Sequence, residues 1–127
     1  MIIGQHYPDN IVGDKMDENV KKELDKIVSI IVKTGIASKI ILFGSYAKGE
    51  ETPDSDLDLC VLTPVRDKRP IDIMIDLRMK LYGVKTMPMD LLAYNQDDFW
   101  GHAKRTTSFE HVIAEDGVTL YECRLSA

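Results

Sequence analysis

Apolar residues recur at helical spacing in the first third of the chain. The positions that share one face are Val20, Leu24, Ile27, Val28 and Ile31. Apolar residues three and four positions apart predict an amphipathic helix. Asp14 or Asp17 is a suitable N-cap for this helix, and Gly35 is a suitable stop. Residues 1–13 contain Gly and Pro and show no such pattern, so we expect an irregular N-terminal arm there.

Four short apolar runs further along the chain have the length and composition of β-strands. We expect strands at Lys39–Phe43, Leu57–Leu62, Met89–Tyr94 and Val118–Tyr121. Pro88 has no backbone N–H to donate, which suits the first position of a strand or an edge strand. Helices are expected from Pro70 to Gly83, over Asp97–Arg105 and over Ser108–Glu115. Helices that alternate with short strands indicate an α/β or α+β layer structure.

The composition is typical of one folded domain. The chain has 127 residues, of which 44% are hydrophobic and 29% are charged, close to the averages for globular proteins. This length supports one hydrophobic core, so we expect a single domain over residues 1–127. No apolar run approaches the roughly 20 residues that span a bilayer, and the first residues lack the features of a secretory signal. We therefore expect a cytoplasmic protein that does not enter a membrane.

The net charge of −5 restricts the partners of the chain. Proteins that bind a nucleic-acid backbone use clustered Lys and Arg, so we do not expect stable binding to nucleic acid. A polyanion could still bind through metal ions. The two cysteines, Cys60 and Cys123, are far apart in sequence, and we interpret both as reduced thiols.

The segment from Gly44 to Leu59 carries most of the candidate chemistry. Gly44 and Gly49 have the spacing of a phosphate-binding P-loop. That motif needs Lys and then Ser or Thr after the second glycine, whereas Glu50 and Glu51 follow here. Two carboxylates at this place would repel a triphosphate, which excludes the P-loop.

The aspartates of this segment also match part of a calcium-binding EF-hand loop. Asp54, Asp56 and Asp58 have the spacing of its first, third and fifth ligands. The sixth position of that loop must be Gly and the twelfth must be a bidentate Glu. This chain has Leu59 and Val65 at those positions, so the EF-hand is excluded as well.

Asp56 and Asp58 are better explained as strand residues. Side chains alternate across a strand, so we expect both carboxylates on one face while Leu57 and Leu59 enter the core. Two carboxylates on one face repel each other unless a cation lies between them. Mg²⁺ suits such hard oxygen ligands and commonly binds substrate phosphates as well. In the Gly-Ser turn at residues 44–45, the glycine lets the backbone approach a phosphate and the serine hydroxyl can donate to it.

A Gly-Ser turn after one strand, then ten residues, then Asp-Leu-Asp on the next strand resembles the nucleotidyltransferase superfamily that includes DNA polymerase beta. The fuller string, from Gly44 to Gly49 and from Asp54 to Leu59, looks most like the stand-alone minimal nucleotidyltransferases. The resemblance implies the nucleotidyltransferase fold, a small mixed β-sheet with helices packed on it. It also implies a third carboxylate from a later strand, and Asp90 is at the matching position.

The resemblance implies a role for each of these residues. The implied catalytic and metal-binding residues are Asp56, Asp58 and Asp90, which would hold two Mg²⁺ ions around the triphosphate of ATP. Gly44 and Ser45 would bind the phosphates. Lys48 is a further candidate for nucleotide binding, at a position where many relatives have Arg; Lys keeps the charge and lacks the bidentate fork. Pro88, just ahead of Asp90, is a second departure from the family pattern.

The resemblance also implies the reaction and a partner. AMP would be transferred from ATP to a hydroxyl, and minimal nucleotidyltransferases often pair with a HEPN-domain protein as a toxin–antitoxin module. We therefore expect an antitoxin that adenylylates a tyrosine of a HEPN-domain partner in a hetero-oligomer. Two alternatives stay open: a non-catalytic antitoxin that neutralises a HEPN ribonuclease by binding, and nucleotidyl transfer to a small molecule. Five acidic residues and no basic residue lie from Glu50 to Asp58, so nucleotide binding should depend strictly on metal ions.

Overall fold

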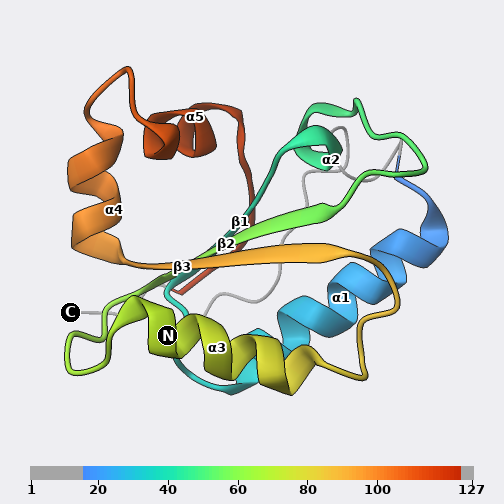
Figure 1. Cartoon of the computed structure of the whole chain (residues 1–127), viewed down its shortest axis with the longest axis horizontal. Coiled ribbons are helices and arrows are strands. Elements are labelled where there is room, and N and C mark those ends of the chain that lie inside the picture. Colours follow the sequence, from blue (N-terminus) through green and yellow to red (C-terminus); the bar gives the residue numbers. More distant parts are fainter. Residues whose placement is uncertain (1–15, 124–127) are drawn as a thin grey trace.

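Four strands form one mixed sheet in the order β3-β2-β1-β4 (Figure 1). The strands are β1 (Lys39–Phe43), β2 (Leu57–Thr63), β3 (Met89–Asn95) and β4 (Val118–Glu122). Strand β1 is antiparallel to both β2 and β4, whereas β2 and β3 run parallel. The structure, a computed structural model, describes residues 16–123, so the arm expected at residues 1–13 lies outside it. Each predicted strand is confirmed to within one residue.

Within residues 16–123, five helices accompany the sheet. They are α1 (Glu18–Lys33), α2 (Ser45–Lys48), α3 (Pro70–Leu81), α4 (Gln96–Ala103) and α5 (Phe109–Asp116). The sequence predicts all of them except α2, which is a single turn and too short to show helical periodicity. None of the helices in this part of the chain has the length and apolar character needed to cross a membrane.

Helix α1 has a defined cap at each end. Of the two candidate N-caps, Asp17 takes this role, because its carboxylate accepts the backbone N–H of Asn19 at 2.7 Å. At the other end, the hydroxyl of Thr34 donates to the carbonyl of Ile31 at 2.6 Å. Gly35 then adopts a φ of +75°, a conformation that glycine reaches without steric cost, so the helix ends where the sequence predicts.

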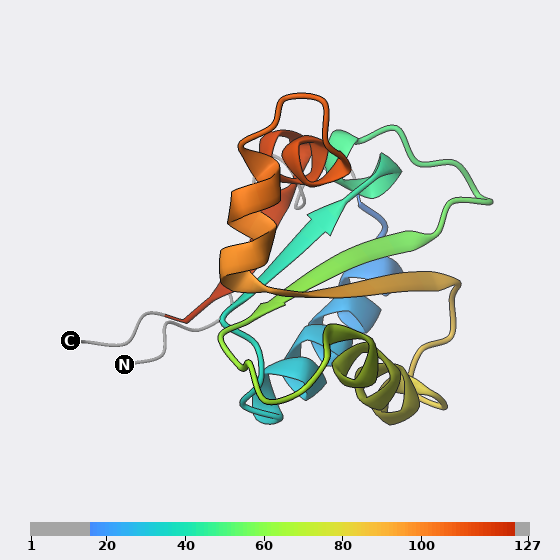
Figure 2. The same ribbon diagram turned by 60° about the vertical axis from the view of Figure 1, so that its left-hand side comes forward.

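Helices cover both faces of the sheet (Figure 2). Along β2, the side chains of Leu57, Leu59 and Val61 pack with α1 and α3 on one face. Cys60 and Leu62 belong to the cluster formed with α4 and α5 on the other face. Because successive side chains of a strand point to opposite faces, Asp58 lies on the same face as Cys60.

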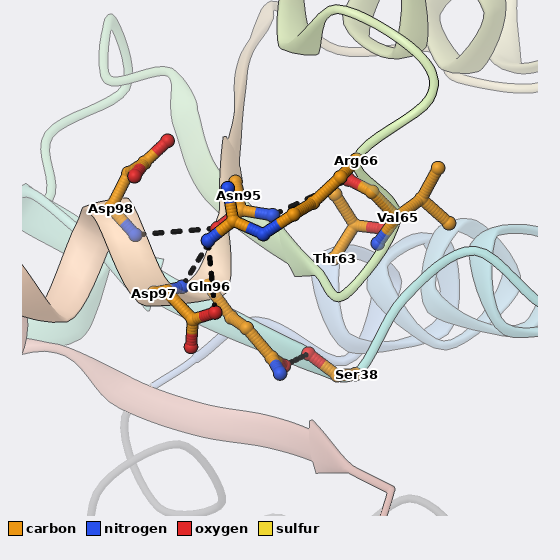
Figure 3. A network of polar contacts seen from close by, with 8 residues as sticks. All are labelled: Ser38, Thr63, Val65, Arg66, Asn95, Gln96, Asp97 and Asp98. Carbon is orange, nitrogen blue, oxygen red and sulfur yellow. Dashed lines mark hydrogen bonds and ion pairs between the residues drawn. The ribbon is translucent and has the colours of Figure 1, made fainter.

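A polar network fixes the corner where β3 passes into α4 (Figure 3). Asn95 is the N-cap of α4, and its Oδ1 accepts two backbone N–H groups of that helix at 2.9 and 3.3 Å. Its Nδ2 donates to the carbonyl of Val65 at 3.3 Å. Ser38 donates from Oγ to Oε1 of Gln96 at 2.7 Å. These bonds join three separate segments at the end of β3 that lies away from Asp90.

Glu23 of α1 fixes the loop that leads into β3. Its side chain is buried. The hydroxyl of Thr86 donates to Oε1, and the backbone N–H of Met87 donates to Oε2 at 3.0 Å. Pairing of β3 with β2 begins two residues later, at Met89. Glu23 therefore holds the chain immediately before the strand residue Asp90.

Replacement of Glu23 should destabilise the fold. We expect Glu23→Ala to lower the free energy of unfolding by about 1–3 kcal/mol, because the Met87 N–H and the Thr86 hydroxyl lose their acceptor. Urea denaturation followed by circular dichroism measures the change. Glu18→Ala, which removes an exposed carboxylate from the same helix, should cost less than about 0.5 kcal/mol. Equal losses in the two variants would contradict the role given to Glu23.

Candidate active site

The predicted carboxylates gather at the start of the parallel strand pair. Asp58 and Asp90 are each the second residue of their strand and are register partners, so their side chains lie on the same face. Asp56 lies just outside the sheet, because pairing starts at Leu57, whose N–H donates to the carbonyl of Pro88 at 3.0 Å. The expectation that Asp56 and Asp58 are both strand residues is therefore wrong for Asp56.

The three carboxylates form one electrostatic group. Burial raises the pKa of the Asp58 carboxyl above its usual value, and the charges of Asp90 and Asp56 raise that pKa further. Repulsion between close carboxylates favours either a proton or a cation among them. The structure thus brings the predicted acids together, and their catalytic role stays a prediction.

Gly44 lies directly against Asp58. Phe43 and Asp58 are partners in the antiparallel ladder between β1 and β2, and Gly44 follows with a φ of +76°. A Cβ atom at Gly44 would overlap Oδ2 of Asp58. Only glycine combines this backbone conformation with so close an approach. Ser45 follows as the first residue of α2, so the predicted phosphate-binding turn and the carboxylates are neighbours in space.

Lys48 is oriented toward α5. Its Nζ lies 3.7 Å from Oδ2 of Asp116, and both side chains are about half exposed. This ion pair connects α2 to the end of α5. Exposed pairs of this kind are weak, so Lys48 could leave Asp116, and its role in nucleotide binding stays a prediction.

Glu51 adds a further negative charge beside α2. Burial raises the pKa of the Tyr46 hydroxyl, and the charge of Glu51 is the next largest cause, followed by those of Asp17 and Asp56. Within the described residues, Oε1 of Glu51 is buried and has no hydrogen-bond partner. Two residues of the acidic run, Glu51 and Asp56, therefore lie close enough to Tyr46 of α2 to raise the pKa of its hydroxyl.

Arg78 is a site residue that the sequence does not reveal. Its Nη2 lies 3.1 Å from Oδ1 of Asp90 and donates to the carbonyl of Leu91, also at 3.1 Å. Arg78 belongs to α3, which packs against β3. The contact follows from this packing and has no counterpart in a local motif.

The donor atoms of the site suit Mg²⁺, although the side chains do not enclose an ion. Among residues 16–123, no three acidic, His or Cys side chains converge on a point that could hold a metal. Mg²⁺ commonly takes only one or two protein carboxylates and completes its shell with water and substrate phosphates. Asp58 with one neighbouring carboxylate satisfies this requirement, and the raised pKa of Asp58 indicates a place where a cation would relieve repulsion. The residues present therefore fit a magnesium–nucleotide site.

Cys60 takes no part in this chemistry. It lies two residues beyond Asp58 on the same strand face and is fully buried. Burial raises the pKa of its thiol to about 12, so the thiol stays protonated near neutral pH. Both Cys60 and Cys123 are free, as the sequence predicts.

Comparison with known proteins places the chain in a family. Residues 18–114 match the model of the nucleotidyltransferase domain, which is most of the chain. The protein therefore belongs to the nucleotidyltransferase domain family, a class of transferases. Together with the sheet order, this confirms the predicted α+β fold.

Two relatives from Methanocaldococcus jannaschii are each named "putative protein adenylyltransferase". One is 32% identical over 105 residues, which cover 81% of this chain and 99% of the relative. The other is 30% identical over 77 residues, which cover 61% and 80%. The crystal structure of a "putative nucleotidyltransferase" from Sulfolobus solfataricus superposes with a TM-score of 0.53 at 16% identity, over 77% of this chain and 76% of that one. This last similarity supports the fold alone.

The contact between Gly44 and Asp58 can be tested with a matched pair of glycine substitutions. Gly35 and Gly44 have nearly equal φ values, of +75° and +76°, but a Cβ at Gly35 would meet nothing within 4 Å. Gly35→Ala should therefore lower the free energy of unfolding by about 1–2 kcal/mol through backbone strain alone. Gly44→Ala should cost more, because it also displaces the Asp58 carboxylate. Equal losses in urea denaturation would show that the close approach has no energetic consequence.

The raised pKa of Asp58 predicts how stability changes with pH. Folding favours the protonated form of this carboxyl, so its contribution to stability is present below the unfolded-state pKa of about 3.9 and is lost as the pH rises through the folded-state pKa. Asp58→Asn should therefore be more stable than the wild-type protein at pH 7, and the difference should vanish below about pH 3.9. Asp54→Asn alters an exposed carboxylate of the loop that precedes β2 and should show no such gain. Loss of stability in Asp58→Asn at pH 7 would contradict the repulsion.

Proposed function

We propose that the protein is a magnesium-dependent adenylyltransferase that transfers AMP from ATP to a hydroxyl of another protein. The observation that carries this proposal is the register of β2 and β3, which places Asp58 beside Asp90. Asp56 is close enough to raise the pKa of Asp58, and Gly44 lies against the same carboxylate. This arrangement, in a chain of the nucleotidyltransferase family, suits the transfer of a nucleotidyl group.

Each residue has a part in the proposed reaction. Asp56 and Asp58 would hold two Mg²⁺ ions and through them the triphosphate, with Asp90 completing the metal site near the acceptor. Bound Mg²⁺ would stabilise the charge on the attacking and departing oxygens. The Gly44–Ser45 turn would orient the phosphates. The acceptor oxygen bonds to the α-phosphorus as the bond to the β-phosphate oxygen breaks, pyrophosphate leaves, and Asp90 takes the hydroxyl proton.

An exposed apolar stripe formed by α3 and its C-cap residue, Tyr82, supports a protein acceptor. The side chains of Ile71, Ile75, Met79 and Tyr82 are 47%, 50%, 73% and 82% exposed, and positions four, eight and eleven residues apart lie on one face of a helix. Contiguous exposed apolar surface marks protein interaction sites. Residues 66–85 carry six basic and three acidic side chains in a chain of net charge −5. Two of the basic side chains, Arg66 and Arg78, are already paired with Asp97 and Asp90, so the apolar stripe rather than the charge supports a protein partner.

We further propose that the partner is a HEPN-domain protein and that the acceptor is one of its tyrosines. Adenylylation would silence this partner, so the chain would act as an antitoxin in a hetero-oligomer. The names of the two archaeal relatives support protein adenylylation as the reaction. Arg78 occupies Asp90, the third carboxylate of the proposed metal site. This contact favours, as a second candidate, an antitoxin that neutralises its partner by binding without catalysis.

A labelling experiment separates these functions. Incubation of the protein with a HEPN-domain partner, Mg²⁺ and ATP labelled at the α-phosphate should label the partner. Label at the γ-phosphate should not be transferred, because pyrophosphate leaves. EDTA and the double variant Asp56→Asn with Asp58→Asn should each abolish transfer, since the metal site is lost, whereas Asp54→Asn should retain it.

The same experiment can contradict the proposal. A partner that is inhibited but carries no label would support the non-catalytic antitoxin. Label that appears on an added small-molecule hydroxyl compound and never on a protein would support a small-molecule transferase. Labelling that persists in the double variant would remove Asp56 and Asp58 from the catalytic site.

A further inference from the structure

Arg78 reaches Asp90 around the edge of the sheet. Strand β3 is at the edge of the sheet that residues 16–123 form, in the order β3-β2-β1-β4, so in this part of the chain some of its backbone groups have no neighbouring strand. The Nη2 atom of Arg78 lies 3.1 Å from both the carbonyl oxygen of Leu91 and Oδ1 of Asp90. One nitrogen of the guanidinium therefore contacts both a backbone carbonyl of the edge strand and the third carboxylate of the site.

This contact puts a positive charge where a metal ion would need an oxygen ligand. The guanidinium of Arg is always charged in proteins, so Arg78 and a divalent cation would compete for Oδ1 of Asp90. Asp58, the register partner of Asp90, has no comparable basic neighbour among the interactions of the described residues: its pKa is raised by burial and by two carboxylates. Of the two paired strand carboxylates, Asp90 alone is thus held by a cationic side chain in this part of the chain.

The contact is easily broken. The side chains of Arg78 and Asp90 are 48% and 54% exposed, and an ion pair in contact with water contributes little. After release, Arg78 keeps the carbonyl of Leu91 as an acceptor and stays near the site. Asp90 would then be free to bind a cation together with Asp58.

We propose that Arg78 is a latch on Asp90: in the metal-free protein it holds this carboxylate in an ion pair, and it releases the carboxylate when a divalent cation binds. Arg78 is therefore a positioning residue that sets the metal concentration at which the third carboxylate joins the site. This inference rests on the proposed function, because it concerns the same carboxylates.

The test measures metal binding in the absence of nucleotide and acceptor. Mn²⁺ is the probe, and electron paramagnetic resonance reports the free ion. Arg78→Gln removes the charge and keeps an amide donor for Leu91, so it should bind Mn²⁺ about two- to fivefold more tightly than the wild-type protein. Arg78→Met should show the same gain, and Arg78→Lys, which keeps the charge, should stay near the wild-type affinity.

Arg66 offers a matched control. Its Nη2 lies 3.0 Å from Oδ2 of Asp97 in another exposed Arg–Asp pair, in the network at the far end of β3 (Figure 3). Arg66→Gln should leave Mn²⁺ affinity unchanged. As a second readout, the rise in melting temperature caused by Mn²⁺ should be larger for Arg78→Gln than for Arg66→Gln.

The possible failures are distinguishable. If Asp58→Asn abolishes Mn²⁺ binding but Arg78→Gln binds no more tightly than the wild-type protein, the latch is wrong and the proposed function stands. If neither the wild-type protein nor any Arg78 variant binds Mn²⁺ without nucleotide, the latch is overturned. The proposed function, in which substrate phosphates complete the metal shell, is tested separately by the labelling experiment. If the wild-type protein fails to bind and Arg78→Gln binds, the latch is supported in its strongest form.

Discussion

Burial of leucine side chains on one face of β2 and β3 is the constraint on which the rest of the structure depends. Leu57, Leu59 and Leu91 are completely buried on that face. Full burial of one such side chain contributes roughly 1.5–3 kcal/mol, and this face buries three of them. The register that buries these leucines places Asp58 beside Asp90 on the other face, where burial and the charges of Asp90 and Asp56 raise the pKa of the Asp58 carboxyl. Burial of the apolar face therefore determines the register, and this register brings the carboxylates together on the other face.

The parts of the fold that the sequence predicts are those encoded by local periodicity and local chemistry. The strands and the four longer helices follow from the spacing of apolar residues, since burial on one face imposes a period of 2 or 3.6. The Gly-Ser turn and the two aspartates after it were visible because they lie within one short segment, residues 44–58. The assignment of Asp90 to the site depends on the family resemblance, since a single aspartate at the start of a strand has no motif of its own.

The parts that the sequence does not predict depend on contacts between distant segments. The ion pair between Lys48 and Asp116 and the contact of Arg78 with Asp90 form only when helices pack beside the sheet. The position of Asp56 outside β2 depends on where pairing with the residue before β3 begins. Each of these properties is set by tertiary structure, which overrides the local pattern at the ends of elements.

The hydrogen bonds from Thr86 and Met87 to Glu23, which we call the Glu23 clamp, limit where the chain can change in length. The clamp holds the backbone N–H of Met87, so the chain enters β3 at a defined residue. Because a shift of one residue moves every side chain of a strand to the opposite face, one insertion between Met87 and Asp90 would turn this carboxylate toward the apolar core and bring a neighbouring residue into the site. Insertions are better tolerated at residues 82–84, which are exposed and precede the clamp. Among homologues of this chain, the loop between α3 and β3 should therefore vary in length before Met87 and keep a constant length after it.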